Sequence, residues 1–169
     1  SMDFTPVTFR FVNDVMPQTR VHTTLAKQLA LFVVLYSPLQ MASDEIENYE
    51  ANPEPFNFIV SCPTDWSRTV VPEACIGSYV TIARCDKGEG YWYIGSITGD
   101  EERTANISLS FLDTDKRYLA TIYRDAPEAD YETCPAAILI EEREVTYSDT
   151  LTIRQARSGG TAVRLCPIK

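Results

Sequence analysis

The chain has 169 residues, 44% hydrophobic and 23% charged, which is the composition of a folded protein with a core and not of a disordered segment. Its formal net charge of −9, with a pI near 4.6, would repel phosphate groups. The charge therefore argues against nucleic acid and against an anionic membrane surface as partners, whereas a neutral ligand such as a sugar is compatible with it.

The first element that the sequence predicts is a long apolar helix over residues 25–42. Its sequence, LAKQLALFVVLYSPLQMA, is apolar on nearly every face, and Thr23 or Thr24 can serve as its N-cap. We expect Pro38 to kink or briefly break it. Its uninterrupted apolar stretch is far shorter than the roughly 20 residues that span a membrane, so the pattern predicts a buried helix and no membrane partner.

This apolar helix is out of place in a chain that otherwise has a β pattern. The remainder is too small to bury such a helix on every side, so we expect the chain to be a piece of a larger protein. With the rest of that protein missing, the outer surface of the helix should be exposed and should favour association or aggregation.

An acidic segment with two prolines, SDEIENYEANPEPF at residues 43–56, follows the helix. Such a change in composition is typical of a boundary between two parts of a chain. The sequence therefore predicts a helical front over residues 1–49 and a separate β domain over residues 50–169.

The region after Asn57 predicts a mainly β fold. Short runs rich in Val, Ile, Thr and Tyr recur about every ten residues and end at Gly, Asp, Asn or Pro, which is typical of an antiparallel sandwich or barrel. Seven strands, which fit a two-sheet, Greek-key-like β-sandwich, are expected near residues 79–84, 91–98, 105–112, 117–124, 136–141, 150–156 and 161–166.

The strand near residues 105–112 shows the clearest alternation, which predicts one buried face and one solvated face. The outward side chains are Thr104, Asn106, Ser108 and Ser110, and the inward ones are Ala105, Ile107, Leu109 and Phe111. Turns are expected at residues 86–90, 113–116 and 158–160.

The residues that carry metal or nucleophilic chemistry form no known pattern. The cysteines, Cys62, Cys75, Cys85, Cys134 and Cys166, include no CxxC pair, and His22 is the only histidine, so there is no zinc signature. Scattered buried thiols are favoured over a disulfide framework. Without a nucleophile-elbow sequence, His22 is favoured as a structural residue over a catalytic one.

Carboxylates and aromatic side chains leave one alternative open. Acidic groups at residues 44–50, 100–102 and 125–132 are favoured as solvated loops, because no spacing pairs them for calcium binding or glycoside hydrolysis. Trp66 and Trp92 could instead form a platform for a sugar ring, since exposed aromatic rings stack on the apolar faces of sugars. Packing in the core is favoured over this platform.

Several stretches of the chain resemble the C-terminal end of glycoside hydrolase family 97, bacterial α-glucosidases and α-galactosidases that include many from Bacteroides-like species. The resemblance covers essentially the whole chain. It is carried by MDFTP, RVHTTLAKQLALFVVLYSPLQMASDEIENYE, PTDW, IGSYVTIAR, WYIGSIT and YLATIYRDAPEAD. The sequence departs from the family pattern at Val7, where the family has Gly, and at Cys134, where it has Asn before Pro.

The resemblance implies that residues 1–49 are the tail and last helix of a catalytic (β/α)₈ barrel, and that residues 50–169 are the C-terminal β-sandwich. The catalytic carboxylates of the family would then lie upstream of Met2, so none is assigned here, and no metal ligand or cofactor is expected in this chain. Asp3 would lie near the mouth of the active site. Calcium, and a periplasmic or secreted location, are implied for the full-length bacterial enzyme.

We therefore expect a structural β domain that braces the barrel and mediates contacts between subunits through the apolar helix or the sandwich. The partners would be the missing barrel of the same protein and other copies of the chain. The alternative is a carbohydrate-binding module that uses Trp66 or Trp92.

Overall fold

The computed structural model describes residues 5 and 7–168, and in these residues helices precede strands. The helices are α1 (Leu25–Val34), α2 (Ile46–Glu50) and α3 (Pro53–Ser61). The strands are β1 (Trp66–Cys75), β2 (Tyr79–Asp86), β3 (Trp92–Thr98), β4 (Arg103–Ser108), β5 (Tyr118–Asp125), β6 (Ile138–Val145), β7 (Thr150–Gln155) and β8 (Gly160–Pro167). No helix among these residues is both long and apolar enough to span a membrane.

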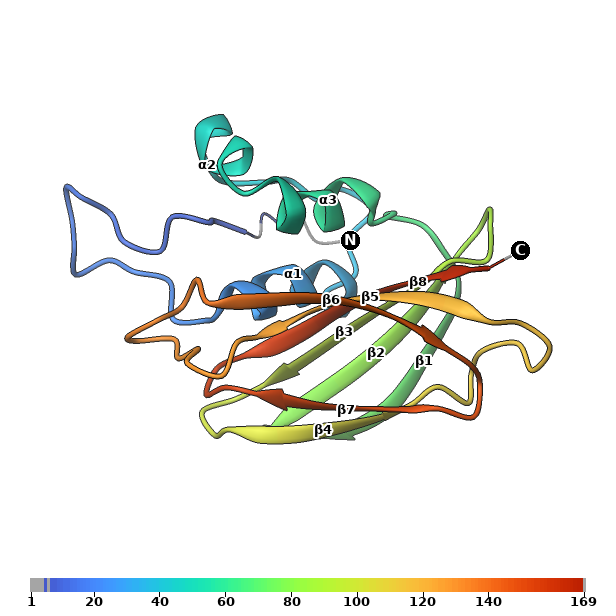
Figure 1. Ribbon diagram of the computed structural model, residues 1–169. Helices are drawn as coiled ribbons and strands as arrows, with labels where there is room; N and C mark the ends of the chain where they lie inside the picture. The colour runs from blue at the N-terminus through green and yellow to red at the C-terminus, as the bar shows by residue number, and fades with distance from the viewer. Residues whose placement is uncertain (1–4, 6, 169) are drawn as a thin grey trace.

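The strands form two antiparallel sheets, so the prediction of a mainly β, antiparallel fold is confirmed. The large sheet has the strand order β1-β2-β3-β8-β5-β6, and the small sheet pairs β4 with β7. Figure 1 shows the small sheet against one face of the large sheet, with α1 and α3 over the opposite face. The large sheet is therefore covered on both faces.

Each face of the large sheet has its own hydrophobic core, because neighbouring residues on a strand point to opposite faces. On β3, Trp92 and Ile94 lie in the core between the two sheets, whereas Tyr93 lies in the core beneath the helices. The alternation predicted around β4 is confirmed, since Ala105 and Ile107 are fully buried, whereas Thr104, Asn106 and Ser108 are exposed.

The helix α1 is shorter than predicted: it has 10 residues and ends at Val34. Thr24 is its N-cap, and its hydroxyl accepts a hydrogen bond from the backbone N–H of Lys27 at 3.3 Å. At the other end Leu35 is already extended, three residues before Pro38, the proline that was expected to break the helix. The prediction of one long helix over residues 25–42 is wrong.

The helix α1 can end at Val34 because side chains from outside the helix donate hydrogen bonds to the carbonyl groups of its last turn. The Gln40 side-chain amide donates to the carbonyl oxygen of Phe32 at 2.9 Å, and the Arg84 Nε atom donates to that of Val33 at 2.7 Å. Because side chains from elsewhere satisfy these carbonyl groups, the helix can end without leaving them unpaired.

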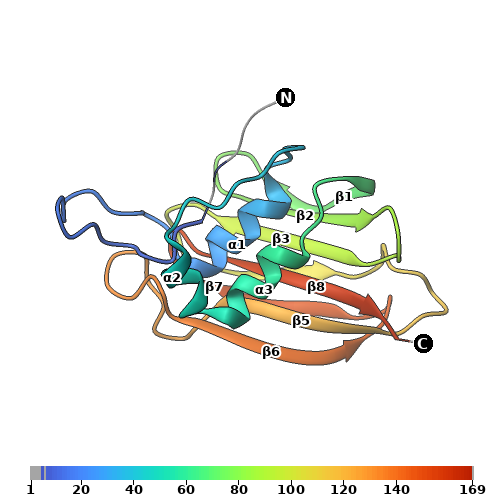
Figure 2. The ribbon, with the colours of Figure 1, turned by 90° about the horizontal axis from the view of Figure 1, so that it is seen from above.

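The expected exposure of α1 is also wrong. Almost all of its side chains are buried, with only Lys27 and Leu31 in partial contact with solvent. The large sheet covers one side, and the other is covered by α3 and by the N-terminal residues Val7 and Phe9. The chain itself therefore shelters the apolar helix (Figure 2).

Two glycines allow α1 to approach the sheet this closely. A Cβ atom at Gly95 on β3 would lie 2.4 Å from the carbonyl oxygen of Ala30, and one at Gly160 on β8 would lie 2.9 Å from the Cα atom of Lys27. Both distances are shorter than van der Waals contact allows. The absence of side chains at these two positions therefore sets the spacing between helix and sheet.

Strands near all seven predicted positions are present, but the edge strand β1 was missed. It carries Pro72, and its pairing with β2 has register shifts, so its pattern does not resemble a regular strand. Proline is tolerated there because an edge strand has one side free of ladder hydrogen bonds. The segment 43–56, expected as a boundary, contains α2 and the start of α3; the division of the chain at residue 49 stays a prediction.

Candidate functional site

The two tryptophans predicted as a sugar platform do not form one exposed surface. Trp92 is 4% exposed and packs against Phe111 in the core, with ring centroids 4.7 Å apart. Trp66, at the start of β1, meets Tyr93 edge-on with centroids 5.6 Å apart. Since stacking on a sugar needs an open aromatic face, this burial does not favour the carbohydrate-binding alternative.

Asp3, which was expected near the mouth of the active site, lies outside the described residues.

Several acidic side chains of the β domain lie in surface ion pairs. Glu102 pairs with Arg154 at 2.5 Å, and Asp130 pairs with Arg157 at 3.0 Å. The backbone N–H of Glu132 and the guanidinium of Arg157 lower the pKa of Asp130. Across residues 5 and 7–168, no group of three or more His, Cys, Asp or Glu side chains could hold a metal ion.

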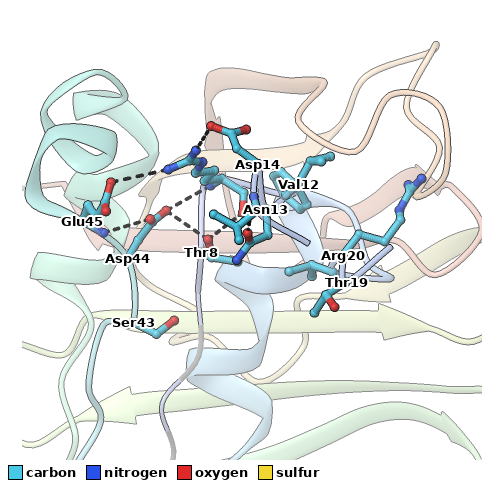
Figure 3. A pocket seen from close by; sticks show the side chains of 13 residues that line it. Thr8, Val12, Asn13, Asp14, Thr19, Arg20, Ser43, Asp44 and Glu45 are labelled. Carbon is cyan, nitrogen blue, oxygen red and sulfur yellow. Dashed lines mark hydrogen bonds and ion pairs between the residues drawn. The ribbon is translucent and has the colours of Figure 1, made fainter. Parts of the chain in front are cut away.

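A surface groove of about 590 Å³ lies beside a hairpin in the N-terminal segment. We call this hairpin, residues 12–20, the arm; an antiparallel bridge between Val12 and Arg20 closes its base. Figure 3 shows the groove between the arm and residues 43–45. Polar side chains from both walls line it, among them Thr8, Asn13 and Asp44.

Asp44 organises one wall of this groove. One carboxylate oxygen accepts hydrogen bonds from the backbone N–H groups of Phe9 at 2.5 Å and Arg10 at 3.0 Å, and from the Thr8 hydroxyl at 3.1 Å. The other accepts from the Asn48 amide at 2.7 Å. Burial opposes ionisation of Asp44, but these hydrogen bonds outweigh burial and lower its pKa.

Val7, just ahead of this wall, has an unusual backbone conformation. Its φ is +73°, a region that favours glycine and strains a β-branched residue. Its N–H donates to the Gln28 side chain at 3.0 Å, and its carbonyl oxygen accepts from the Tyr49 hydroxyl at 2.8 Å. Contacts from α1 and α2 therefore stabilise this conformation.

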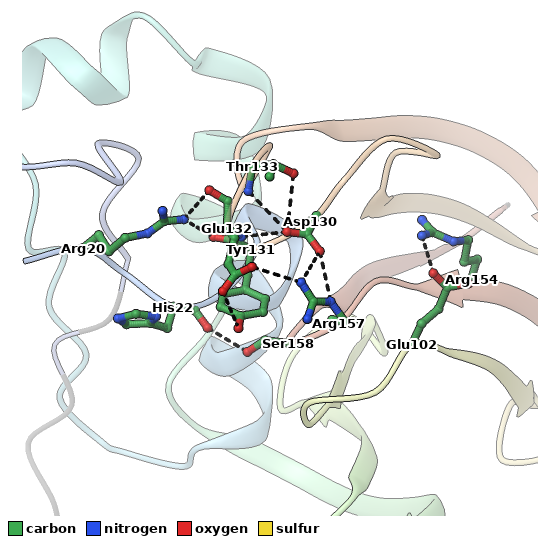
Figure 4. A network of polar contacts seen from close by, with 10 residues as sticks. All are labelled: Arg20, His22, Glu102, Asp130, Tyr131, Glu132, Thr133, Arg154, Arg157 and Ser158. Atoms are coloured by element: carbon green, nitrogen blue, oxygen red, sulfur yellow. Dashed lines mark hydrogen bonds and ion pairs between the residues drawn. The ribbon is translucent and has the colours of Figure 1, made fainter. Parts of the chain in front are cut away.

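The far side of the arm is tied to the loop between β5 and β6. The Arg20 guanidinium donates to the carbonyl oxygens of Tyr131 at 2.5 Å and Glu132 at 2.6 Å (Figure 4). His22 lies next to this loop with its side chain exposed; its carbonyl oxygen accepts from the Ser158 hydroxyl at 2.7 Å. These contacts are structural and include no nucleophile placed beside the imidazole.

Asp125 holds the turn between β7 and β8 from inside the protein. Its carboxylate accepts hydrogen bonds from the backbone N–H groups of Ala156 at 2.8 Å and Gly160 at 3.0 Å. Burial raises the pKa of Asp125, while the hydroxyl of Thr24 and these two N–H groups act in the opposite direction. The hydrogen bonds of the Asp125 carboxylate thus connect the end of β5 with the β7–β8 turn and with the N-cap of α1.

All five cysteines are free. Cys75, at the end of β1, is exposed, so its thiol does not fit the expectation of scattered buried thiols. Burial raises the pKa of Cys62 to about 12, and the nearby Arg84 guanidinium only partly offsets it. The Cys62 thiol is therefore a poor nucleophile at neutral pH.

Sequence reasoning did not single out the arm and its anchors. Arg20 and Asp44 are far apart in the sequence from the residues that they contact. Asn13 contacts near neighbours, but it lies in a stretch without a regular pattern. The only signal in the sequence was the mixture of aromatic residues with Pro6 and Pro17 before the helix, which is typical of a loop that packs against another segment.

The amino-acid sequence matches a known protein family. A family model described as "Glycosyl-hydrolase 97 C-terminal, oligomerisation" matches residues 65–166, which span nearly all of the two sheets. A retaining alpha-galactosidase from Bacteroides thetaiotaomicron is 35% identical over 147 residues. That alignment covers 84% of this chain and 21% of the galactosidase.

Solved structures agree with the sequence comparison. A variant of a Glycoside Hydrolase Family 97 enzyme from a Pseudoalteromonas species, in complex with panose, is 44% identical with a TM-score of 0.93. The match covers 99% of this chain and 26% of that chain. A second structure of a family 97 enzyme from Pseudoalteromonas, in complex with acarbose, is 45% identical with a TM-score of 0.86 and covers 89% of this chain and 23% of its own.

Proposed function

We propose, since this chain belongs to glycoside hydrolase family 97, that it is a non-catalytic β domain through which a larger α-glycosidase assembles into oligomers. The match of the family model to residues 65–166 supports this proposal most directly. The surface ion pairs of Glu102 and Asp130 are consistent with a structural role, because a neighbouring arginine pairs with each carboxylate.

We further propose that the two sheets are a Greek-key β-sandwich and that α1 is the last helix of the catalytic barrel. The burial of α1 between the large sheet and the N-terminal segment supports a bracing role, because one helix then contacts both parts. The division into residues 1–49 and 50–169 belongs to the same proposal.

The activity of the whole enzyme is also a proposal: hydrolysis of α-galactosides or α-glucosides. It is supported by the 35% identity to a retaining alpha-galactosidase. We propose, on the resemblance alone, that the full-length enzyme holds calcium. Within residues 5 and 7–168 no group of three or more His, Cys, Asp or Glu side chains could hold a metal ion. We propose a periplasmic or secreted location on the same resemblance.

Two measurements on the purified chain test the proposed domain function. The chain should show no turnover of p-nitrophenyl α-galactoside or α-glucoside, with or without calcium, and it should elute as a dimer or larger oligomer in size-exclusion chromatography with light scattering. Turnover that disappears when its own carboxylates are substituted would refute the non-catalytic role. A monomer at all concentrations would refute the oligomerising role.

A further inference from the structure

The turn between β1 and β2 carries the most exposed large apolar side chain in the part of the chain that the structure describes. This side chain is Ile76, which is fully exposed, at 104%. The turn lies at one edge of the large sheet, because β1 is its outermost strand, and Figure 2 shows β1 and β6 at opposite edges. Ile76 therefore gains no burial within this chain, and its whole apolar surface is available to a partner.

The turn holds Ile76 in a fixed position. The N–H of Ser78 donates to the carbonyl oxygen of Cys75 at 2.9 Å, and Gly77 has a φ of +82°, as the third residue of a type II turn requires. The N–H of Gly99, in the loop after β3, donates to the carbonyl oxygen of Ser78 at 2.7 Å. Because a second segment braces the turn, Ile76 loses little further entropy on docking.

A groove of about 380 Å³ lies directly beside Ile76. Apolar groups of Ala74, Val80 and Ile97 line it. None of the residues that line it is acidic, and the one charged residue among them is Lys27. The Lys27 ammonium already donates to the carbonyl oxygen of Thr98 at 2.7 Å. The groove therefore offers an apolar surface to an apolar side chain.

The charge distribution favours this edge of the sheet for a contact between copies. Each copy carries a net charge of −9, so two copies repel each other except where carboxylates are few. The opposite edge, β6, exposes four consecutive charged residues at 141–144, and such charges prevent an edge strand from pairing with another chain. Residues 74–78 are uncharged, and the carboxylate of Asp100 beside the groove interacts with the Lys27 ammonium, which compensates part of its charge.

The family model indicates the kind of partner. Its description names oligomerisation, and its span, residues 65–166, contains the turn and every residue that lines the groove except Lys27. We propose that two copies of this chain associate through the β1–β2 turn, with Ile76 of each copy seated in the groove of the other. This inference rests on the proposed function, because it names the surface through which the domain oligomerises.

The position of the groove favours a two-fold contact. Ile76 and the groove lie side by side on one copy, so a two-fold axis between two copies forms both contacts at once and gives a closed pair. A head-to-tail contact would instead leave one turn and one groove unused at each end.

Ile76 serves as the anchor of this contact and not as the whole interface. Stable interfaces bury roughly 1,200–2,000 Å² in total, of which one side chain supplies a small part. A few side chains that fill pockets nevertheless carry most of the binding energy. Val71, which is 54% exposed on β1, continues the apolar surface along the same edge.

The test uses the full-length enzyme that carries this chain, with Ile76→Asp to change the anchor and, separately, Ala74→Glu to place a charge in the groove. Both side chains are exposed, so the domain should still fold, which circular dichroism checks. The matched control is Tyr147→Asp. Tyr147 is 43% exposed in the β6–β7 turn, at the other edge of the sheet. Light scattering and sedimentation measure the mass and the dissociation constant.

The wild type should be an oligomer, and Ile76→Asp should halve its mass, because a two-fold contact joins copies in pairs. Its dissociation constant should rise by about thirtyfold, the effect of removing an anchor residue. Ala74→Glu should act in the same direction, whereas Tyr147→Asp should keep the wild-type mass.

The thiol of Cys75, next to Ile76, gives a second readout. At a concentration where the wild type is oligomeric, an aromatic disulfide reagent should modify Cys75 several-fold faster in Ile76→Asp than in the wild type, because the contact covers this thiol. The rate in Tyr147→Asp should equal that of the wild type. Equal rates in all three proteins would contradict the contact.

The outcomes separate this inference from the proposed function. An oligomer whose mass is unchanged by Ile76→Asp would overturn the inference and assign oligomerisation to another surface. Unchanged mass with faster release of the C-terminal fragment by limited proteolysis would assign the groove to the rest of the same polypeptide, and would overturn it as well. A wild-type enzyme that is monomeric at all concentrations would refute the oligomerising role itself.

Discussion

Arg103 on β4 donates two hydrogen bonds to the carboxylate of Glu73 on β1, at 3.0 and 2.9 Å, and so ties the small sheet to the edge of the large one. The same guanidinium lies 3.6 Å above the ring of Tyr79, and Thr81 donates to Glu73 at 3.0 Å. This pair is one of the polar contacts that join the two sheets beside their apolar core.

Glu73→Ala should lower the free energy of unfolding by about 2 kcal/mol, because it leaves the guanidinium of Arg103 without its carboxylate in a site where both side chains are less than 20% exposed. Urea denaturation measures the change. The control is Glu144→Ala, whose ion pair with Arg117 is more than half exposed and should be worth less than about 0.5 kcal/mol. Equal effects of the two substitutions would contradict the role assigned to Glu73.

Gly95→Ala should destabilise the chain by about 2 kcal/mol, because the added methyl group would meet the carbonyl oxygen of Ala30 at 2.4 Å and force α1 away from the sheet. The control is Gly88→Ala in the β2–β3 turn, where the nearest atom would lie at 3.7 Å. Thermal unfolding of both variants tests this. A Gly95→Ala variant as stable as the wild type would show that the close approach of α1 is not required.

Asp125→Ala should cost about 3 kcal/mol, because the backbone N–H groups of Ala156 and Gly160 would be left buried without acceptors. Asp149→Ala is a matched control, since Asp149 also accepts a backbone N–H in a turn between two strands, that of Thr146 between β6 and β7, but is exposed. Denaturation curves of the two variants give the comparison. A smaller loss at Asp125 than at Asp149 would contradict the importance of burial.

The stabilising effect of Asp44 should depend on pH. Because hydrogen bonds lower its pKa in the folded state, its contribution is complete above the usual Asp value of about 3.9 and is lost as the pH falls through the lowered folded pKa. The difference in unfolding free energy between the wild type and Asp44→Asn should therefore shrink as the pH falls below 4. A difference that stays constant between pH 7 and pH 2.5 would refute the assignment.

Thiol labelling should separate the cysteines by exposure. At pH 8 an aromatic disulfide reagent should modify the exposed Cys75 first, whereas Cys62, whose buried thiol has a pKa of about 12, should react only after unfolding. The fast phase should disappear in Cys75→Ser. Rapid labelling of Cys62 in the folded chain, detected by mass spectrometry of peptides, would contradict its burial.

Local patterns predicted the β part of the fold well. The alternation around Ala105 and Ile107 depends only on which face of a strand each side chain takes, and the structure has that alternation. The N-cap of α1 was predicted as Thr23 or Thr24, because N-capping is a local preference, and the structure has Thr24. The family was evident as well, because whole stretches of sequence resemble its members.

Long-range contacts account for what the patterns missed. The end of α1 depends on Gln40 and Arg84, which cap its last carbonyl groups from outside the helix. The strand β1 exists because β2 pairs with it despite Pro72. The arm is anchored by Arg20 across more than a hundred residues. Arg84, β2 and the loop that Arg20 contacts lie outside the window over which a periodicity is evaluated, and the contact of Gln40 with Phe32, although only eight residues long, is not a property of the apolar pattern.

The amino-acid sequence by itself determined which segments are apolar, which residues alternate along a strand, and to which family the chain belongs, because these properties depend on neighbouring residues. The tertiary structure decided that the apolar helix is short and sheltered by its own chain, that Trp92 lies in the core, and that Arg20 anchors the arm across more than a hundred residues. The reason is that burial is set by which distant surfaces meet, and here two glycines and a few side chains from remote segments determine how closely they do so.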